Sequence, residues 1–244
     1  MLHKTEGLVL RTVKYSESSV IVMVFTELFG IQSYLVNGVR SSSAKRNKAN
    51  LLQPGNLLEM VAYHREIKNL QRLSEFKLAY IYQGIQLDIV KNAVALFLIE
   101  LLQHSLHQPE AQPELFAFVK EAFCLLDRED QLAANLPLFF TLKLGQHLGF
   151  GLSENHSPER PYLNLQEGFF VSTPPHHPYY LDITLSEITA KFLSVRDIRL
   201  ISSITLNKAH RRSLLEAYLE YFRLHLPDFR ELKSPVILQE LLGI

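Results

Sequence analysis

The first eighty residues alternate short, β-branched apolar stretches with polar turns, a pattern typical of β-strands. Polar residues 16–19 separate the first two stretches, and Gln53-Pro54-Gly55-Asn56 is a turn sequence that precedes the fourth. The strands predicted from this pattern are 7–15, 20–25, 31–36, 57–63 and 70–78. Five short strands suggest a small closed barrel, because closure removes the exposed edges of so short a sheet.

After residue 80 the apolar positions recur every three or four residues, which predicts amphipathic helices. The predicted helices span 88–107, 113–126 and 138–148, followed by one that begins at Ser186 and one that runs from Asn207 to residue 226. Ser186 and Asn207 are suited to helix N-caps, and Gly149 is suited to end the third helix. Segment 151–182 is dense in proline, asparagine, histidine and aromatic residues, and we expect a loop there. The expected fold is multidomain α and β, with a β-barrel in residues 1–80 and an all-α helical domain in residues 81–244.

The formal net charge of the chain is zero, which by itself argues against a nucleic-acid partner. The zero hides an asymmetry. Residues 1–80 carry eleven lysines and arginines against six acids, a net charge of +5, so residues 81–244 carry −5. A basic barrel can meet a polyanion while an acidic remainder faces other partners. Five charges scattered over the surface without a function are the alternative.

Sequence signatures of common enzymes are absent. No Gly-Lys-Ser/Thr of a nucleotide-binding loop, no His-Glu-x-x-His and no Gly-x-Ser-x-Gly occurs in the sequence. His156, His176 and His177 share one segment, but three histidines without regular spacing or a supporting cysteine fit solvated side chains better than a metal site. We therefore expect a protein that is not an enzyme and holds no metal or other cofactor.

Cys124 is the only cysteine, so no disulfide can form within the chain, which fits a reducing cytoplasm. Its place between Phe123 and Leu125 in a predicted helix favours a buried thiol. The longest apolar stretch, 93–102, is interrupted by Glu100 and is too short to span a bilayer. The first residues lack the apolar segment of a secretory signal. We expect a cytoplasmic protein with no membrane partner.

Segment 37–50 interrupts the strand pattern with a glycine, three consecutive serines and a run of cations, and we expect an exposed loop. Arg40, Lys45, Arg46 and Lys48 place four positive charges within nine residues, with no acid between them. Serine and asparagine side chains add neutral donors for phosphate oxygens, and loops of small barrels commonly contact nucleic acid. A solvated loop that only keeps the protein soluble is the alternative that composition leaves open.

Side chains on the predicted strands extend this candidate site. Arg11 and Lys14 on the first strand are further candidate DNA contacts. Tyr34, Tyr63 and Phe76 can stack on bases, although aromatic residues in strands more often belong to the core.

A set of short motifs follows in order along the chain. In the first third they are Thr5-Glu6-Gly7-Leu8-Val9-Leu10, Tyr15-Ser16-Glu17-Ser18-Ser19, Phe25-Thr26, Gly30, Gly38-Val39-Arg40, Lys45 and Leu52-Gln53-Pro54-Gly55. Further on they are Phe97-Leu98-Ile99-Glu100-Leu101-Leu102, Leu144-Gly145-Gln146-His147-Leu148-Gly149-Phe150, Leu214-Leu215, Tyr221 and His225-Leu226. Each motif is weak alone, but together they span nearly the whole chain, and in this order they resemble the RecO family of bacterial DNA repair proteins.

The resemblance implies an N-terminal OB-fold followed by a helical domain. It also implies a recombination mediator that binds single- and double-stranded DNA and anneals complementary strands. With the partner RecR, such proteins help load RecA onto DNA coated by single-stranded-DNA-binding protein. The basic barrel residues of the family map onto Arg40 and Lys45, and Arg46 and Lys48 join them only by proximity.

Many family members carry a four-cysteine zinc site in the helical domain, in the segment that corresponds to residues 151–180 here. This chain has none of those cysteines, so we do not carry zinc over. Packing of aromatic side chains is expected to hold the segment instead. The candidates are Tyr162, Phe169, Phe170, Tyr179 and Tyr180.

The acidic helical domain is expected to bind protein. A basic pocket on it can accept the acidic, apolar C-terminal tail of single-stranded-DNA-binding protein, and the candidates by local charge are Arg199, Lys208, Arg211 and Arg212. A solvated helix start explains the last three equally well. Two rival functions are a protein-interaction adaptor built on a small β-barrel, in which the basic loop is incidental, and a hydrolase with an unrecognised site.

Overall fold

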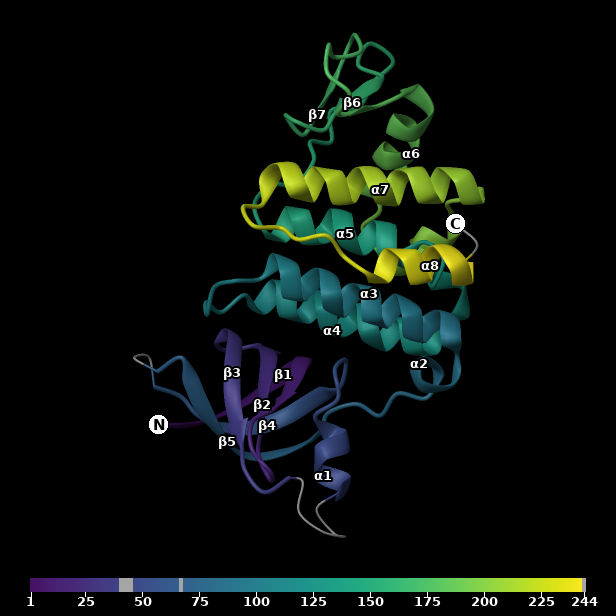
Figure 1. The fold of residues 1–244 in the computed structure, drawn as a ribbon. Coiled ribbons are helices and arrows are strands. Elements are labelled where there is room, and N and C mark those ends of the chain that lie inside the picture. Colours follow the sequence, from purple (N-terminus) through teal and green to yellow (C-terminus); the bar gives the residue numbers. More distant parts are fainter. Residues whose placement is uncertain (40–45, 66–67, 243–244) are drawn as a thin grey trace. The chain divides into compact units, whose positions relative to one another are not determined.

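A computed structural model of the chain describes residues 1–39, 46–65 and 68–242. The chain forms two compact units, shown in Figure 1. The barrel unit comprises Met1–Gln83 and Leu102–Cys124, and the helical unit comprises Gly84–Leu101 and Leu125–Ile244.

Five strands form a closed barrel, as the strand pattern predicted, and their order is β1-β2-β3-β5-β4. Their bounds are β1 Leu2–Lys14, β2 Val20–Thr26, β3 Gly30–Val36, β4 Leu57–Tyr63 and β5 Leu70–Leu78. β3 and β5 close the barrel through a short parallel pairing of residues 33–35 with residues 70–72. Every other pair in the barrel is antiparallel.

The barrel core is apolar, with Val22, Val24 and Leu58 among its fully buried members. Tyr34 is also fully buried there, so this ring belongs to the core and not to a stacking surface. The prediction of a continuous loop over 37–50 was wrong in its last part. A short helix, α1, spans Arg46–Leu51, and Leu52 directly after it is buried in the barrel core.

Two helices contribute to both units: α3, Ile89–Ser105, and α4, Pro113–Arg128. Within the barrel unit, Phe116 of α4 packs on Phe25 of β2 with ring centroids 5.6 Å apart, and Lys120 forms an ion pair with Glu6. Cys124 also lies on α4 and is only partly buried, so the prediction of a buried thiol was wrong.

The helical unit contains the remaining helices. These are α2 Gly84–Leu87, the 3₁₀ turn η1 Asp130–Leu132, α5 Leu136–His147, α6 Ile183–Ser194, the 3₁₀ segment η2 Ile198–Ser203, α7 Lys208–His225 and α8 Ser234–Leu242. Asn207 caps α7 as predicted, accepting a hydrogen bond from the His210 amide at 2.7 Å. Ser186 does not cap α6. Asp182 does so, and the buried Ser186 hydroxyl instead donates to the carbonyl of Leu181.

Segment 151–182, predicted as an irregular loop, contains a small three-stranded sheet in the order β7-β6-β8. Its strands are β6 Tyr162–Asn164, β7 Phe169–Val171 and β8 Tyr180–Leu181. Of the five aromatic residues expected to hold the segment, Phe170 is fully buried, whereas Phe169 stays 39% exposed. Hydrogen bonds add to the packing. The Tyr221 hydroxyl donates to the Phe150 carbonyl at 2.6 Å, and the His225 Nε2 lies 2.9 Å from the Leu165 carbonyl oxygen.

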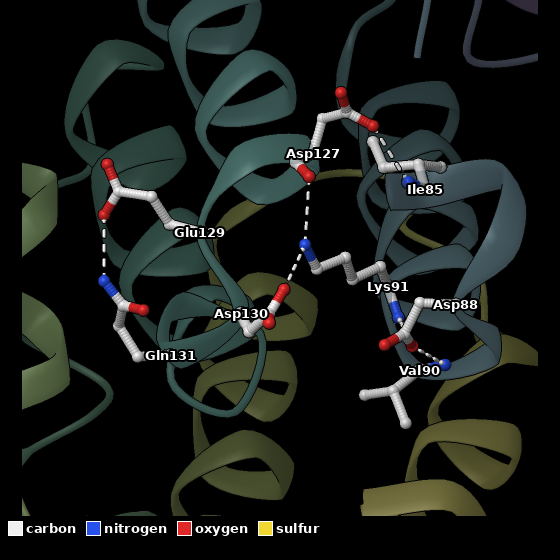
Figure 2. A network of polar contacts seen from close by, with 8 residues as sticks. All are labelled: Ile85, Asp88, Val90, Lys91, Asp127, Glu129, Asp130 and Gln131. Carbon is white, nitrogen blue, oxygen red and sulfur yellow. Dashed lines mark hydrogen bonds and ion pairs between the residues drawn. The ribbon is translucent and has the colours of Figure 1, made fainter. Parts of the chain in front are cut away.

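A buried lysine joins the start of α3 to the end of α4 within the helical unit (Figure 2). Lys91 is only 3% exposed. Its Nζ donates to the Asp127 carbonyl at 2.9 Å and pairs with Asp130 Oδ1 at 2.6 Å. The Asp127 carboxylate accepts the Ile85 amide at 2.9 Å, which ties α2 to the same point.

In the helical unit, the N-terminus of α8 is capped by a side chain that is remote in sequence. The Glu100 carboxylate of α3 accepts hydrogen bonds from the backbone amides of Lys233 and Ser234, at 2.9 and 2.8 Å, where α8 begins. A carboxylate at this position is favourable because the first amides of a helix have no partner within the helix.

Candidate nucleic-acid interface

The cations of the predicted basic loop are only partly described. Arg40 and Lys45 lie outside the described residues, and so does the side chain of Arg46. Lys48 is exposed on α1. The start of the loop is anchored to the turn between β1 and β2, because the Val39 amide donates to the Ser18 carbonyl at 3.0 Å.

The structure brings α1 to the stretch of β1 that carries Arg11 and Lys14. The hydroxyl of Thr12, between those two residues, donates to the Leu52 carbonyl just after α1 at 2.5 Å. Arg11 and Lys14 are both exposed. Three predicted DNA contacts, Arg11, Lys14 and Lys48, therefore belong to adjoining parts of the barrel unit.

A second group of cations, which no run of charges in the sequence singles out, lines a pocket of about 450 Å³ on the barrel. The described lining residues are Leu35, Tyr63, Arg65, Lys68, Leu70, Gln71 and Arg72. Three of them are cations and none is an acid. Within the described ranges, none of these three cations forms an ion pair. Their charge is thus available to an anionic ligand.

The strand register explains why this pocket forms on the outer face of the barrel. Arg72 of β5 lies opposite Tyr63 of β4 on one side and opposite Leu35 of β3 on the other. Residues directly opposite one another in a sheet point to the same face. The neighbouring residues Gln71 and Tyr34 are buried, so Arg72 and its two partners point outward. Leu35 lies two positions before Asn37, so the pocket adjoins the start of segment 37–50.

A buried glutamine holds the backbone between β4 and β5, which carries two of the pocket cations. The Gln71 side chain is 3% exposed. Its amide nitrogen donates to the carbonyls of Arg65 at 2.8 Å and Lys68 at 2.7 Å. Its oxygen accepts the Arg65 backbone amide at 3.1 Å. These three bonds, together with the 3.0 Å bond from the Lys68 amide to the Arg65 carbonyl, hold the backbone at Arg65 and Lys68.

Another cation pair on the barrel is neutralised. Lys4 and Lys77 both contact the Glu59 carboxylate, at 3.8 and 3.0 Å. The hydrogen bond from Lys77, its positive charge and that of Lys4 hold the pKa of the Glu59 carboxyl below its usual value. This patch also includes Glu75, so it attracts a polyanion much less strongly than the pocket does.

The three strand aromatics named as candidate stacking residues have different surroundings. Tyr34 is in the core, and Phe76 packs partly buried against it. Tyr63 is 45% exposed and lines the cation pocket. The sequence held one usable signal for this grouping. A hairpin that joins strands 57–63 and 70–78 brings Tyr63, Arg65, Lys68 and Arg72 to the same end of the two strands.

The cations predicted to bind protein have separate surroundings. Arg199 pairs with Glu129 and Asp197, each at 3.5 Å, and Arg212 pairs with Glu216 at 2.9 Å. Lys208 is exposed at the start of α7. The half-buried Arg211 donates to the Asn135 side chain at 3.2 Å, and burial lowers the pKa of its guanidinium.

A groove of about 690 Å³ lies beside α6 and η2 in the helical unit. Ile188, Val195, Leu200 and Ile204 supply its apolar lining, and Lys191 and Arg196 are its described cations. Lys191 pairs with Glu187 at 2.8 Å, and Arg196 pairs with Glu154 at 2.7 Å. None of the four predicted protein-binding cations is among the described lining residues of this groove.

Metal-binding and membrane-spanning features do not emerge from the described part of the chain. In those residues, no three histidine, cysteine, aspartate or glutamate side chains gather where they can hold a metal ion. His156 packs edge-on against Phe170 at 5.1 Å, and His177 Nδ1 accepts the Tyr179 amide at 3.2 Å. None of the described helices combines the length and the apolar character needed to cross a membrane.

Comparison with known proteins gives one consistent result. Residues 1–82 match the family model described as "Recombination protein O N terminal", and residues 86–235 match "Recombination protein O C terminal". The DNA repair protein RecO of Flavobacterium psychrophilum is 32% identical over 240 residues, which cover 97% of this chain and 98% of the relative. The proteins of the same name from Christiangramia forsetii and Bacteroides fragilis are 31% and 34% identical, and the matches cover at least 99% of each chain.

Proposed function

The chain belongs to the RecO family of DNA repair proteins, and from that premise we propose that it binds single- and double-stranded DNA and anneals complementary strands without catalysing a covalent step. The observation that supports the proposal best is the cation pocket on the outer face of the barrel, whose described lining includes Arg65, Lys68 and Arg72 and no acid. It adjoins the start of the segment that carries Arg40 and Lys45. Together these cations give the barrel a surface for a polyanion.

The proposed mechanism is electrostatic. Phosphates of two strands repel each other, and a basic surface that contacts both lowers this repulsion so that complementary bases can pair. Binding also releases condensed counterions, so affinity falls as salt rises. Arg11, Lys14, Arg46 and Lys48 are further proposed phosphate contacts, because they share the barrel unit with the pocket.

The proposed partners are RecR and the C-terminal tail of single-stranded-DNA-binding protein, with loading of RecA onto coated DNA as the outcome and the cytoplasm as the place. For the acidic, apolar tail, the groove beside α6 and η2 is better suited than the four predicted cations. Its apolar lining can accept the apolar part of the tail, and Lys191 and Arg196 can exchange their partners Glu187 and Glu154 for the acidic part.

Reversal of two loop charges tests the proposal. The double variant Arg40→Glu/Lys45→Glu is expected to weaken binding to a labelled single strand and to flatten the plot of log affinity against log salt. The slope should change by about 0.7 for each phosphate that the variant no longer neutralises. The measurement is fluorescence anisotropy of the full chain over a series of salt concentrations.

A matched control is Lys4→Glu/Lys77→Glu, which reverses the same number of charges at the neutralised patch around Glu59. The control should lose less affinity and keep most of the slope. Equal losses for both double variants would mean that only the total charge matters. Absence of DNA binding by the unmodified chain at low salt would favour the protein-interaction adaptor.

A further inference from the structure

We infer that the cation pocket binds one unpaired nucleotide, with the base stacked on the ring of Tyr63 and the flanking phosphates held by Arg65, Lys68 and Arg72. The inference rests on the proposed DNA binding and deepens it, because it gives the barrel a means to distinguish single strands from duplex. Three features that lie together support it: the exposed ring of Tyr63, three cations without described ion-pair partners, and the buried side chain of Gln71, which holds the backbone of two of them.

The chemistry of the pocket fits a nucleotide better than a bare anion. Its volume of about 450 Å³ is larger than a phosphate group needs. Beside the cations it offers two apolar surfaces, because Tyr63 is 45% and Leu70 is 37% exposed. Base stacking on an aromatic ring accepts any base, since every base has a π-face. In a duplex the faces of the bases are stacked on their neighbours, so Tyr63 can contribute to binding only where a base is unpaired.

Gln71 is the positioning residue of this pocket. Because its buried amide makes three hydrogen bonds to the turn, it fixes the backbone of Arg65 and Lys68 before DNA arrives. It also lies next to Arg72 on β5, so one side chain connects the turn with the strand that carries the third cation. A pocket held in advance loses less conformational entropy on binding.

The main test compares a labelled oligothymidine with a blunt-ended duplex of two complementary strands, each bound by the full chain in an anisotropy titration. Tyr63→Leu is expected to weaken binding to oligothymidine about tenfold, which is within the range measured for loss of one base stack. Affinity for the blunt-ended duplex should change less than about twofold, because Tyr63 meets no unpaired base there. Tyr63→Phe should keep the affinity for both, because it keeps the ring. Phe169→Leu, which removes a similarly exposed ring from the helical unit, is the matched control and should also change neither.

The cations are tested through the salt dependence. Arg72→Gln should reduce the slope for oligothymidine by about 0.7. Lys77→Gln removes the same charge from the same strand outside the pocket, and should leave the slope unchanged.

Gln71→Leu tests the positioning role. If its unfolding midpoint shows that this variant is folded, it should reduce the slope as Arg72→Gln does, because Arg65 and Lys68 are no longer held. If it does not fold, Arg72→Gln and Tyr63→Leu still decide the matter, since both side chains are exposed.

The outcomes separate this inference from the proposed function. If the unmodified chain binds oligothymidine but Tyr63→Leu binds it equally well, or loses affinity equally for the blunt-ended duplex and the single strand, the proposed nucleotide pocket is wrong and the proposal of DNA binding stands. If Gln71→Leu folds and keeps the full slope, its positioning role is wrong. If the unmodified chain binds no DNA, both proposals fail.

Discussion

Two buried polar side chains, Gln71 in the barrel unit and Lys91 in the helical unit, fix segments of backbone through hydrogen bonds. Each is 3% exposed, and each bonds to backbone carbonyls. Neither role could be predicted from sequence. Gln71 looks like an outward polar residue of a half-buried strand, and Lys91 looks like part of a solvated helix face. Their partners lie in the turn before β5 and at the end of α4, so only the folded chain identifies them.

Replacing the buried lysine is expected to destabilise the helical unit. Lys91→Met keeps most of the side-chain volume but leaves the Asp127 carbonyl without the Nζ donor, at a cost of about 1–3 kcal/mol in unfolding free energy. Asp130 is 91% exposed and can be solvated in the variant. Urea unfolding followed by circular dichroism measures the effect. Glu121→Ala, at an exposed position of α4, should change stability by less than about 0.5 kcal/mol. A Lys91→Met protein as stable as the unmodified chain would show that the buried network contributes nothing.

Strands and helices with a clear apolar period were predictable, and those defined by distant partners were not. The five barrel strands and the long helices were expected within a few residues of their observed bounds. β1 begins at Leu2 instead of residue 7, because its first half pairs with β4 through Leu2↔Tyr63 and the following residues. β6, β7 and β8 have two or three residues each, too few to show a period. α8 lies beyond the last predicted helix, and its start is capped by Glu100, which is remote in sequence.

Gly30, at the start of β3, and Gly38, two residues after its end, both have a left-handed backbone but have different surroundings. Gly30 has φ +59°, and a Cβ there would lie 2.1 Å from the Glu110 carbonyl oxygen, whereas Gly38 has φ +71° and open space around its Cβ position. Gly38→Ala should therefore lower the unfolding free energy by about 1–2 kcal/mol, the cost of the left-handed backbone conformation alone. Gly30→Ala adds a steric clash and should cost about 3 kcal/mol or more. Thermal unfolding of both variants measures the difference. Equal costs would mean that Glu110 does not approach Gly30.

For the whole chain, the distribution of charge indicates where a polyanion can bind, whereas the net charge of zero does not. The zero total divides into a basic first third and an acidic remainder, and that division alone points to the barrel as the surface for a polyanion. The candidate site was only partly predictable. The sequence singled out the run from Arg40 to Lys48, because adjacent charges are visible in a sequence. It did not reveal the pocket, because Arg65, Lys68 and Arg72 come together only when β4, β5 and β3 close the barrel.

The central claim is that the basic barrel holds two strands and anneals them by neutralising their phosphates. The most direct measurement is the rate at which two complementary labelled oligonucleotides pair in the presence of the full chain, followed by energy transfer between their labels as salt is raised. We expect pairing to be accelerated at low salt, the acceleration to fade as salt rises, and Arg40→Glu/Lys45→Glu to reduce it more than Lys4→Glu/Lys77→Glu. Pairing at the protein-free rate at every salt concentration, although the chain is folded, would contradict the account.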